Sequence, residues 1–151
     1  MKFAIGGEPV KLLGVVRTVW REIHENPKFA DTRIGIASRC DEPNWAMELL
    51  KMFVVCDRGT NENGVVHGVT MFQAAEPLIE IYRESKQVHF EELQKKTDID
   101  FEDMLFFDDD PFNISDVSKL GVTCVLTPDG VTKTAWELGL HDFAMNKKQD
   151  K

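Results

Sequence analysis

Apolar residues recur with two different periods along this chain, and the alternation of helix-like and strand-like segments predicts its architecture. Helical spacing and helix-capping residues predict helices in five segments: 9–25, 40–53, 86–97, 111–121 and 133–140. Short apolar runs between them predict strands at 32–38, 77–82, 104–107 and 122–126. These runs are continuously apolar, which is typical of parallel strands covered by helices on both faces. The pattern therefore predicts an α/β fold with a doubly wound parallel sheet.

Residues that cap or interrupt helices set the expected boundaries. Pro9 suits the first position of the first helix, and Asn26-Pro27 is expected to end it. Asp41 or Asn44 is expected to cap the second helix. The segment 58–64, RGTNENG, is dense in Asn and Gly and predicts an exposed loop.

Composition indicates one globular domain with no preference for nucleic acid. The chain has 151 residues, of which 42% are hydrophobic and 29% charged, with no break that would suggest two domains. We expect one domain at 1–145 and a disordered polar tail at 146–151. The net charge of −8 argues against a nucleic-acid partner, because binding a phosphate backbone needs clustered Lys and Arg.

The cysteines and the hydropathy pattern indicate the compartment. Cys40, Cys56 and Cys124 are widely separated and show neither metal-binding spacing nor a disulfide framework, which favours a reducing compartment. No apolar run approaches the length needed to span a bilayer, so no membrane partner is expected. A cytoplasmic protein is the expectation.

Polar and charged residues follow the ends of three predicted strands. Ser38-Arg39 follows the first strand, Lys86 comes after the second, and Asp108-Asp109-Asp110 follows the third. Ligands of such sheets bind at the carboxyl ends of the strands. Lys and Ser suit phosphate oxygens, and carboxylates suit Mg²⁺. An acidic helix start would explain one or two of the three aspartates but not all of them, so we predict a phosphate site with magnesium beside it.

Three segments, IGIASRC, EIYRESKQVHFEEL and MLFFDDDPFNISDVSKLGVTCV, resemble the haloacid dehalogenase superfamily and, within it, the magnesium-dependent phosphatase family. The resemblance runs from about Pro9 to Leu140 and includes three motifs in the family order. It implies a Rossmann-like domain that hydrolyses phosphomonoesters through an aspartyl-phosphate with Mg²⁺. The implied partners are a phosphorylated small molecule or a phosphoprotein, with phosphotyrosine and sugar phosphates as candidate substrates.

The resemblance also implies a role for each candidate site residue. Ser38 matches the phosphate-binding hydroxyl, and Arg39 follows it as in family members. Lys86 matches the catalytic lysine that holds the phosphate. Asp109 matches the catalytic, metal-ligating carboxylate, and Asp108 supports the metal shell. Asn113 lies where other members carry a further acidic residue. His89 is expected to be a half-buried helix residue and not a ligand.

The first motif of the family has no counterpart in this sequence. That motif is an apolar strand ending in Asp-x-Asp, whose first Asp is the nucleophile and whose second is the general acid and base. It would precede the first helix, but MKFAIGGE (1–8) contains no aspartate. Asp57 and the pair Asp98-x-Asp100 lie in the wrong places to replace it. We therefore expect the N-terminal strand to be missing and phosphatase activity to be negligible.

Two hypotheses account for this gap. In the first, the sequence is an N-terminally incomplete form of an active phosphatase; the presence of Ser38, Lys86 and Asp109 favours it. In the second, it is a non-catalytic pseudophosphatase that binds Mg²⁺ or a phosphorylated ligand.

Overall fold

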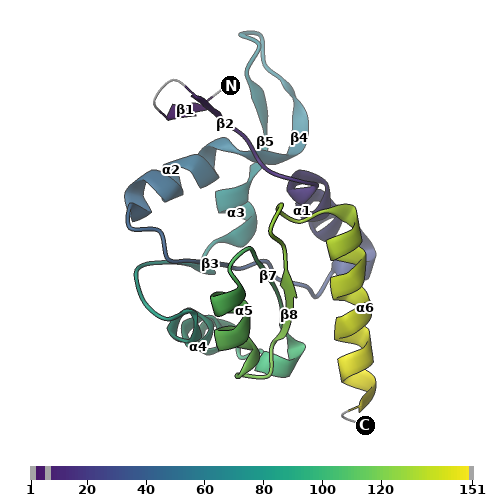
Figure 1. Cartoon of the computed structure of the whole chain (residues 1–151). Helices are drawn as coiled ribbons and strands as arrows, with labels where there is room; N and C mark the ends of the chain where they lie inside the picture. The colour runs from purple at the N-terminus through teal and green to yellow at the C-terminus, as the bar shows by residue number, and fades with distance from the viewer. Residues whose placement is uncertain (1–2, 6–7, 150–151) are drawn as a thin grey trace.

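The computed structural model describes residues 3–5 and 8–149, in which short strands alternate with helices (Figure 1). The parallel strands form two pairs: β3 (Ile36–Ser38) with β6 (Ile79–Ile81), and β7 (Leu105–Asp108) with β8 (Thr123–Leu126). Among the described residues, no strand joins the two pairs. The α/β class with parallel strands is confirmed. β3 ends at Ser38 as expected, and β7 runs one residue further than predicted, so that it includes Asp108.

Helices cover both parallel pairs. α5 (Pro111–Ser118) connects β7 to β8, and Figure 1 shows this strand pair between α5 and α6 (Lys133–Gln149). α4 (Lys86–Thr97) contacts β3, β6 and α5. The buried core between these elements consists of Phe90, Phe106, Val117 and Val122.

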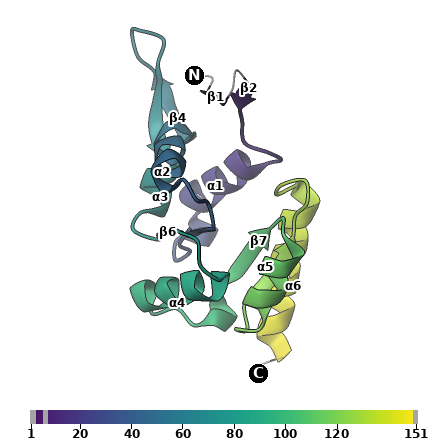
Figure 2. The same cartoon turned by 60° about the vertical axis from the view of Figure 1, so that its left-hand side comes forward.

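A second group of elements surrounds an antiparallel hairpin. The hairpin consists of β4 (Val54–Thr60) and β5 (Val66–Thr70), and Val55, Cys56 and Met71 form the core beneath it. In Figure 2 the hairpin lies with α2 (Pro43–Met52) and α3 (Met71–Ala75) on one side, while β7, α5 and α6 lie on the other. The described part of the chain therefore has two hydrophobic clusters, and the predicted site residues lie on or next to β3, α4 and β7.

The loop expected at 58–64 is partly strand. β4 continues to Thr60, and the turn follows it, where Asn61 Oδ1 accepts hydrogen bonds from the backbone N–H groups of Asn63 (3.0 Å) and Val65 (2.9 Å). The hairpin was not predicted because the second half of β4 is polar and exposed. Such a segment is supported by hydrogen bonds to its neighbour and leaves little trace in the hydrophobic pattern.

The first helix begins later than predicted. β1 (Phe3–Ile5) and β2 (Glu8–Val10) pair antiparallel in the segment where the helix was expected to begin, and α1 (Val16–Glu25) starts only at Val16. Gly14 has a φ of +61°, which a right-handed helix does not admit, and the N–H of Val15 donates to the carbonyl of Val131 at 2.8 Å. The predicted end is confirmed, because Asn26 is the C-cap and the 3₁₀ helix η1 (Pro27–Phe29) follows.

Two other boundary predictions are wrong. The N-cap of α2 is Glu42, with Pro43 at the first helical position and no side-chain cap, so neither Asp41 nor Asn44 caps it. α6 runs to Gln149 and includes most of the segment expected to be a disordered tail.

Contacts with the body of the fold hold this last part of α6. Asn146 Nδ2 donates to Thr123 Oγ1 at 2.9 Å, and Lys147 forms an ion pair with Asp103 of the 3₁₀ helix η2 (Phe101–Asp103). Polar residues there form tertiary contacts, which composition does not reveal. The rest of the predicted tail, 150–151, lies outside the described residues. Within the described part of the chain, no helix is long and apolar enough to cross a membrane.

Candidate active site

A buried ion pair lies at the carboxyl end of β7. Asp108 is the last residue of that strand, Lys86 is the first residue of α4, and the Nζ of Lys86 hydrogen-bonds to Asp108 Oδ2. Lys86 is only 7% exposed and Asp108 only 8%. The same ammonium lies 5.3 Å from the ring centroid of Phe106. Charges are rarely buried unless paired, so each of these groups depends on the other.

Further hydrogen bonds hold Asp108 in its charged form. The N–H of Asp110 donates to Asp108 Oδ1 at 2.8 Å, and Asn113 Nδ2 lies 3.5 Å and 3.4 Å from Oδ1 and Oδ2. Burial by itself would raise the pKa of Asp108, but the hydrogen bonds from Lys86, Asp110 and Asn113 and the lysine charge lower that pKa overall. Asp108 is therefore an ionised carboxylate at neutral pH.

The three consecutive aspartates differ in their surroundings. Asp110 is the N-cap of α5, and its Oδ1 accepts the N–H of Phe112 at 2.9 Å. Asp109 is exposed and has no hydrogen bond or ion pair within the described residues. The helix-start explanation thus accounts for Asp110, while Asp108 belongs to the ion pair and Asp109 has free carboxylate oxygens.

The structure links Ser38 to the same helix as Lys86. Ser38 ends β3, and its Oγ accepts the N–H of Cys40 at 3.2 Å. Its carbonyl oxygen lies 2.9 Å from Nε2 of His89, which lies one turn after Lys86 on α4. Ser38, Lys86 and Asp108 are therefore held by a common set of elements: β3, α4 and β7. Arg39 is exposed, without a hydrogen bond or ion pair among the described residues.

His89 is the residue whose importance the sequence reasoning missed. It is 0% exposed, not half-buried as expected, and both ring nitrogens lie within hydrogen-bond distance of carbonyl oxygens. A signal was present in the pattern, because the buried residues of α4 follow helical spacing: Lys86, His89, Phe90 and Leu93.

The charge of Asp108 affects the pKa of Cys124, which lies on β8. Burial and then the negative charge of Asp108 raise the pKa of its thiol to about 11. The thiol therefore stays protonated at neutral pH and takes no part as a thiolate.

The carboxylates fit a hard cation. Mg²⁺ prefers carboxylate oxygens and water, and it is usually bound through one or two protein carboxylates. Asp109 offers free oxygens, and the ionised Asp108 directly precedes it in the chain. A cation at Asp108 would share the carboxylate with the ammonium of Lys86, so Asp109 would be the better-placed first ligand and Asp108 the supporting one.

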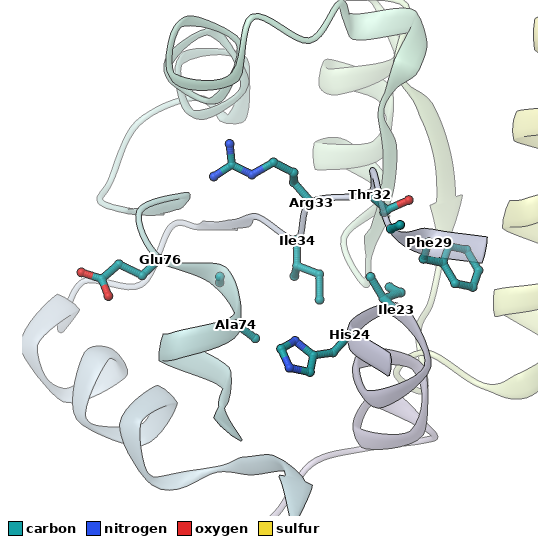
Figure 3. A pocket seen from close by; sticks show the side chains of 10 residues that line it. Ile23, His24, Phe29, Thr32, Arg33, Ile34, Ala74 and Glu76 are labelled. Atoms are coloured by element: carbon teal, nitrogen blue, oxygen red, sulfur yellow. The ribbon is translucent and has the colours of Figure 1, made fainter. Parts of the chain in front are cut away.

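One pocket of the structure lies apart from these residues. It has a volume of about 340 Å³ and is lined by Ile23, His24, Phe29, Ala30, Thr32, Arg33, Ile34, Ala74, Ala75 and Glu76. Figure 3 shows the imidazole of His24 directed toward its centre, whereas the side chains of Arg33 and Glu76 point outward. None of the predicted site residues lines it, so we do not assign the phosphate site there.

Comparisons with known proteins agree with the motifs. The family model described as acid phosphatase matches residues 4–146. The human protein magnesium-dependent phosphatase 1 is 54% identical over 65 residues, which are 43% of this chain and 37% of that protein. The matched part therefore spans well under half of that curated relative. The resemblance to the magnesium-dependent phosphatases of the haloacid dehalogenase type is confirmed, and the chain belongs to the acid phosphatase family.

Proposed function

We propose that this chain binds phosphate monoesters together with Mg²⁺ at the carboxyl ends of β3 and β7, as the phosphate- and metal-holding part of a magnesium-dependent phosphatase. The single observation that carries this proposal is the buried Lys86–Asp108 pair at the end of β7. A buried ammonium with three donors, fixed at the edge where ligands of α/β sheets bind, is suited to an anion with several oxygens.

The neighbouring groups complete a phosphate site. The hydroxyl of Ser38 accepts the N–H of Cys40, which leaves its own hydrogen free to donate to a phosphate oxygen. Arg39 follows directly and is exposed, so its guanidinium is available to an incoming phosphate. Hydrogen bonds between such cationic donors and phosphate are among the stronger ones in proteins.

The metal is proposed to bind through Asp109, with Asp108 in support. When bound, Mg²⁺ would neutralise charge on the phosphate and on the carboxylates. The name of the human relative, which describes a magnesium-dependent phosphatase, supports this choice of cation. Asp109→Asn is expected to weaken Mg²⁺ binding in a calorimetric titration. Equal binding by the parent and the variant would remove Asp109 as a ligand.

The reaction is proposed to be hydrolysis of a phosphomonoester through an aspartyl-phosphate, with phosphotyrosine or a sugar phosphate as the substrate. That route needs an acceptor carboxylate, and the sequence has no aspartate before Asp31. Turnover of an aryl phosphate by the 151-residue chain is therefore expected to be negligible, although phosphate is expected to bind. Substantial turnover that Lys86→Ala abolishes would show that another group serves as the acceptor.

The second candidate function is binding without catalysis. The observation that favours it is that, among the described residues, Asp108 is the only carboxylate paired with Lys86. The two candidates separate when an aspartate-bearing segment is supplied: a chain that belongs to an active phosphatase gains turnover, and a pure binding protein does not.

A titration with inorganic phosphate tests the binding site itself. In ¹⁵N–¹H correlation spectra with and without Mg²⁺, the amides around Ser38 and at the start of α4 are expected to shift. Lys86→Ala is expected to weaken binding roughly 10- to 100-fold, because one charge-assisted hydrogen bond contributes about 1.5–3 kcal/mol.

Two further variants make the titration decisive. Lys95→Ala removes an exposed lysine of the same helix and is expected to leave phosphate binding unchanged. Ser38→Ala tests the site without disturbing the buried ion pair, and it is expected to weaken binding while the fold is retained. Unchanged binding in both Lys86→Ala and Ser38→Ala would overturn the proposed function.

A further inference from the structure

Both ring nitrogens of His89 face groups that can only accept hydrogen bonds. Nδ1 lies 3.0 Å from the carbonyl oxygen of Ser85, and Nε2 lies 2.9 Å from that of Ser38 and 3.0 Å from that of Tyr82. A neutral imidazole carries only one N–H, so its other nitrogen would direct a lone pair at a carbonyl lone pair. Only the imidazolium donates from both nitrogens.

We propose that His89 is a buried imidazolium that donates through both ring nitrogens and thereby positions Ser38 and Lys86 for phosphate binding. The positioning half of this inference rests on the function proposed above, whereas the charge state does not. His89 is a positioning residue, because it acts through Ser38 and α4 and contacts no substrate.

The surroundings of the ring are suited to a cation that has no carboxylate partner. Three carbonyl oxygens supply partial negative charge within hydrogen-bond distance. The ring of Tyr82 stacks against the imidazole with a centroid separation of 4.2 Å and an interplanar angle of 15°. Aromatic faces attract cations, and this attraction strengthens when water is excluded. The imidazole is 0% exposed, so water cannot reach it, and these protein groups replace water in stabilising its charge.

Charged side chains of α4 itself and of α5, β6 and β7 form the electrostatic surroundings of this helix. Lys86 on the same helix repels an imidazolium, but Asp108 of β7 neutralises that ammonium. Asp116 of α5 accepts a hydrogen bond from the hydroxyl of Ser85 at 2.7 Å, which places a carboxylate at the start of α4. On β6, Glu80 is paired with Lys96 at 2.6 Å. Asp108 thus neutralises Lys86, and Asp116 adds a negative charge at the start of α4.

The hydrogen bonds of His89 join three chain segments that shape the site. Nε2 joins the end of β3, at Ser38, to Tyr82, which directly follows β6. Nδ1 holds Ser85, the N-cap of α4, whose next residue is Lys86. The carbonyl oxygens of Ser38 and Ser85 also accept the backbone N–H groups of Tyr82 (3.0 Å) and Val88 (3.0 Å). Loss of the imidazolium would therefore remove the side-chain link between these segments rather than every donor, and it would loosen the position of Ser38 relative to Lys86.

The charge state is tested by ¹⁵N NMR of the histidine side chains in the parent protein at neutral pH. We expect both ring nitrogens of His89 to show protonated, closely similar shifts, each coupled to a slowly exchanging proton. The exposed His24, His67 and His141 supply reference signals for both forms when the pH is varied. One nitrogen of His89 with the shift of an unprotonated acceptor would overturn the inference, whether or not phosphate binds.

The positioning role is tested with His89→Gln in the phosphate titration, with His141→Gln on α6 as the matched control. Loss of a group that orients a metal ligand typically costs about 10- to 100-fold in metal affinity or activity, and we expect a loss of this order in phosphate affinity for His89→Gln. We also expect the amides of Ser38 and Lys86 to shift in the unliganded variant. A folded variant that binds phosphate as tightly as His141→Gln would overturn the positioning role.

Two outcomes separate this inference from the proposed function. If the parent shows the imidazolium signature but binds no phosphate, both the proposed function and the positioning role are refuted. The inferred charge state of His89 is then still supported. If phosphate binds and the ring is neutral, the proposed function stands and this inference fails. Where His89→Gln does not fold, the ring spectrum of the parent decides the charge state, and His89→Asn replaces His89→Gln in the phosphate titration.

Discussion

The buried pair of Lys86 and Asp108 makes the sharpest prediction about stability. In Lys86→Met the Asp108 carboxylate stays buried, with the N–H of Asp110 and the long contacts from Asn113 as its remaining donors. Removing one member of a buried ion pair typically destabilises a protein by about 3–5 kcal/mol. For a chain of this size such a loss lowers the melting temperature by roughly 10 °C. Asp108→Asn is expected to cost a similar amount, because it leaves the ammonium unpaired above the ring of Phe106.

The double variant Lys86→Met/Asp108→Asn distinguishes this explanation from simple loss of packing. It contains no buried charge at this site, so it is expected to be more stable than either single variant, within about 2 kcal/mol of the parent. Urea unfolding followed by circular dichroism measures the three free energies, and their non-additivity gives the coupling. The exposed pair Lys95–Glu92 on the same helix is the control, and its removal is expected to change stability little. Additive losses at Lys86 and Asp108 within about 0.5 kcal/mol would refute the reasoning.

The same pair predicts how stability changes with pH. Folding lowers the pKa of Asp108 below its ordinary value of 3.8, so its contribution is fully present above that value. The contribution is lost as the pH falls through the lower pKa of the folded state. The stability difference between the parent and Asp108→Asn is therefore expected to shrink in acid, and a difference that grew as the pH fell would contradict this sign.

Two other predictions concern residues outside the ion pair. At mildly alkaline pH, an alkylating reagent is expected to modify the half-buried Cys40 well before Cys124, as followed by mass spectrometry. The reason is that a pKa of about 11 leaves the Cys124 thiol almost entirely protonated. Equal alkylation rates would contradict the argument that burial and the charge of Asp108 raise this pKa. Gly14→Ala is expected to lower the free energy of unfolding by about 2 kcal/mol or more, because a Cβ at φ +61° is strained and would also meet the carbonyl of Val131. Gly64→Ala is the control, because its φ of +75° carries the same backbone strain while a Cβ there would meet no atom within 4 Å. A smaller loss of stability than for Gly14→Ala is expected, and thermal melts of the two variants measure the difference.

The elements that carry the site were predictable from sequence because each has a local signal. α4 occupies Lys86–Thr97 as predicted, with Ser85 as a capping side chain before it. The strands that end in Ser38 and Asp108 are apolar runs that finish in polar residues. This pattern is typical of a buried parallel strand whose carboxyl end is close to solvent. These features involve neighbours within a few residues, so the pattern contains them.

The features that sequence did not reveal depend on distant contacts. The start of α1 is set by the approach of Val131 to Val15, more than a hundred positions away in the chain. The end of α6 is set by the contacts of Asn146 and Lys147 with other elements. The role of His89 depends on carbonyl oxygens from two other segments. No local propensity encodes such pairings, which arise only when the chain is folded.

The alternation of side chains along a strand explains why the three consecutive aspartates have different surroundings. Side chains alternate between the two faces of a strand, so in β7 Phe106 and Asp108 share a face, and both are buried. The ring of Phe106 packs edge-on against Phe90 of α4 at 4.9 Å, which places Asp108 on the side where Lys86 begins that helix. Asp109, one residue on, lies beyond the strand and is exposed, and Asp110 caps α5. Three identical residues therefore avoid mutual repulsion because the strand-to-helix junction gives each carboxylate different surroundings: an ammonium, solvent and the free N–H groups of a helix.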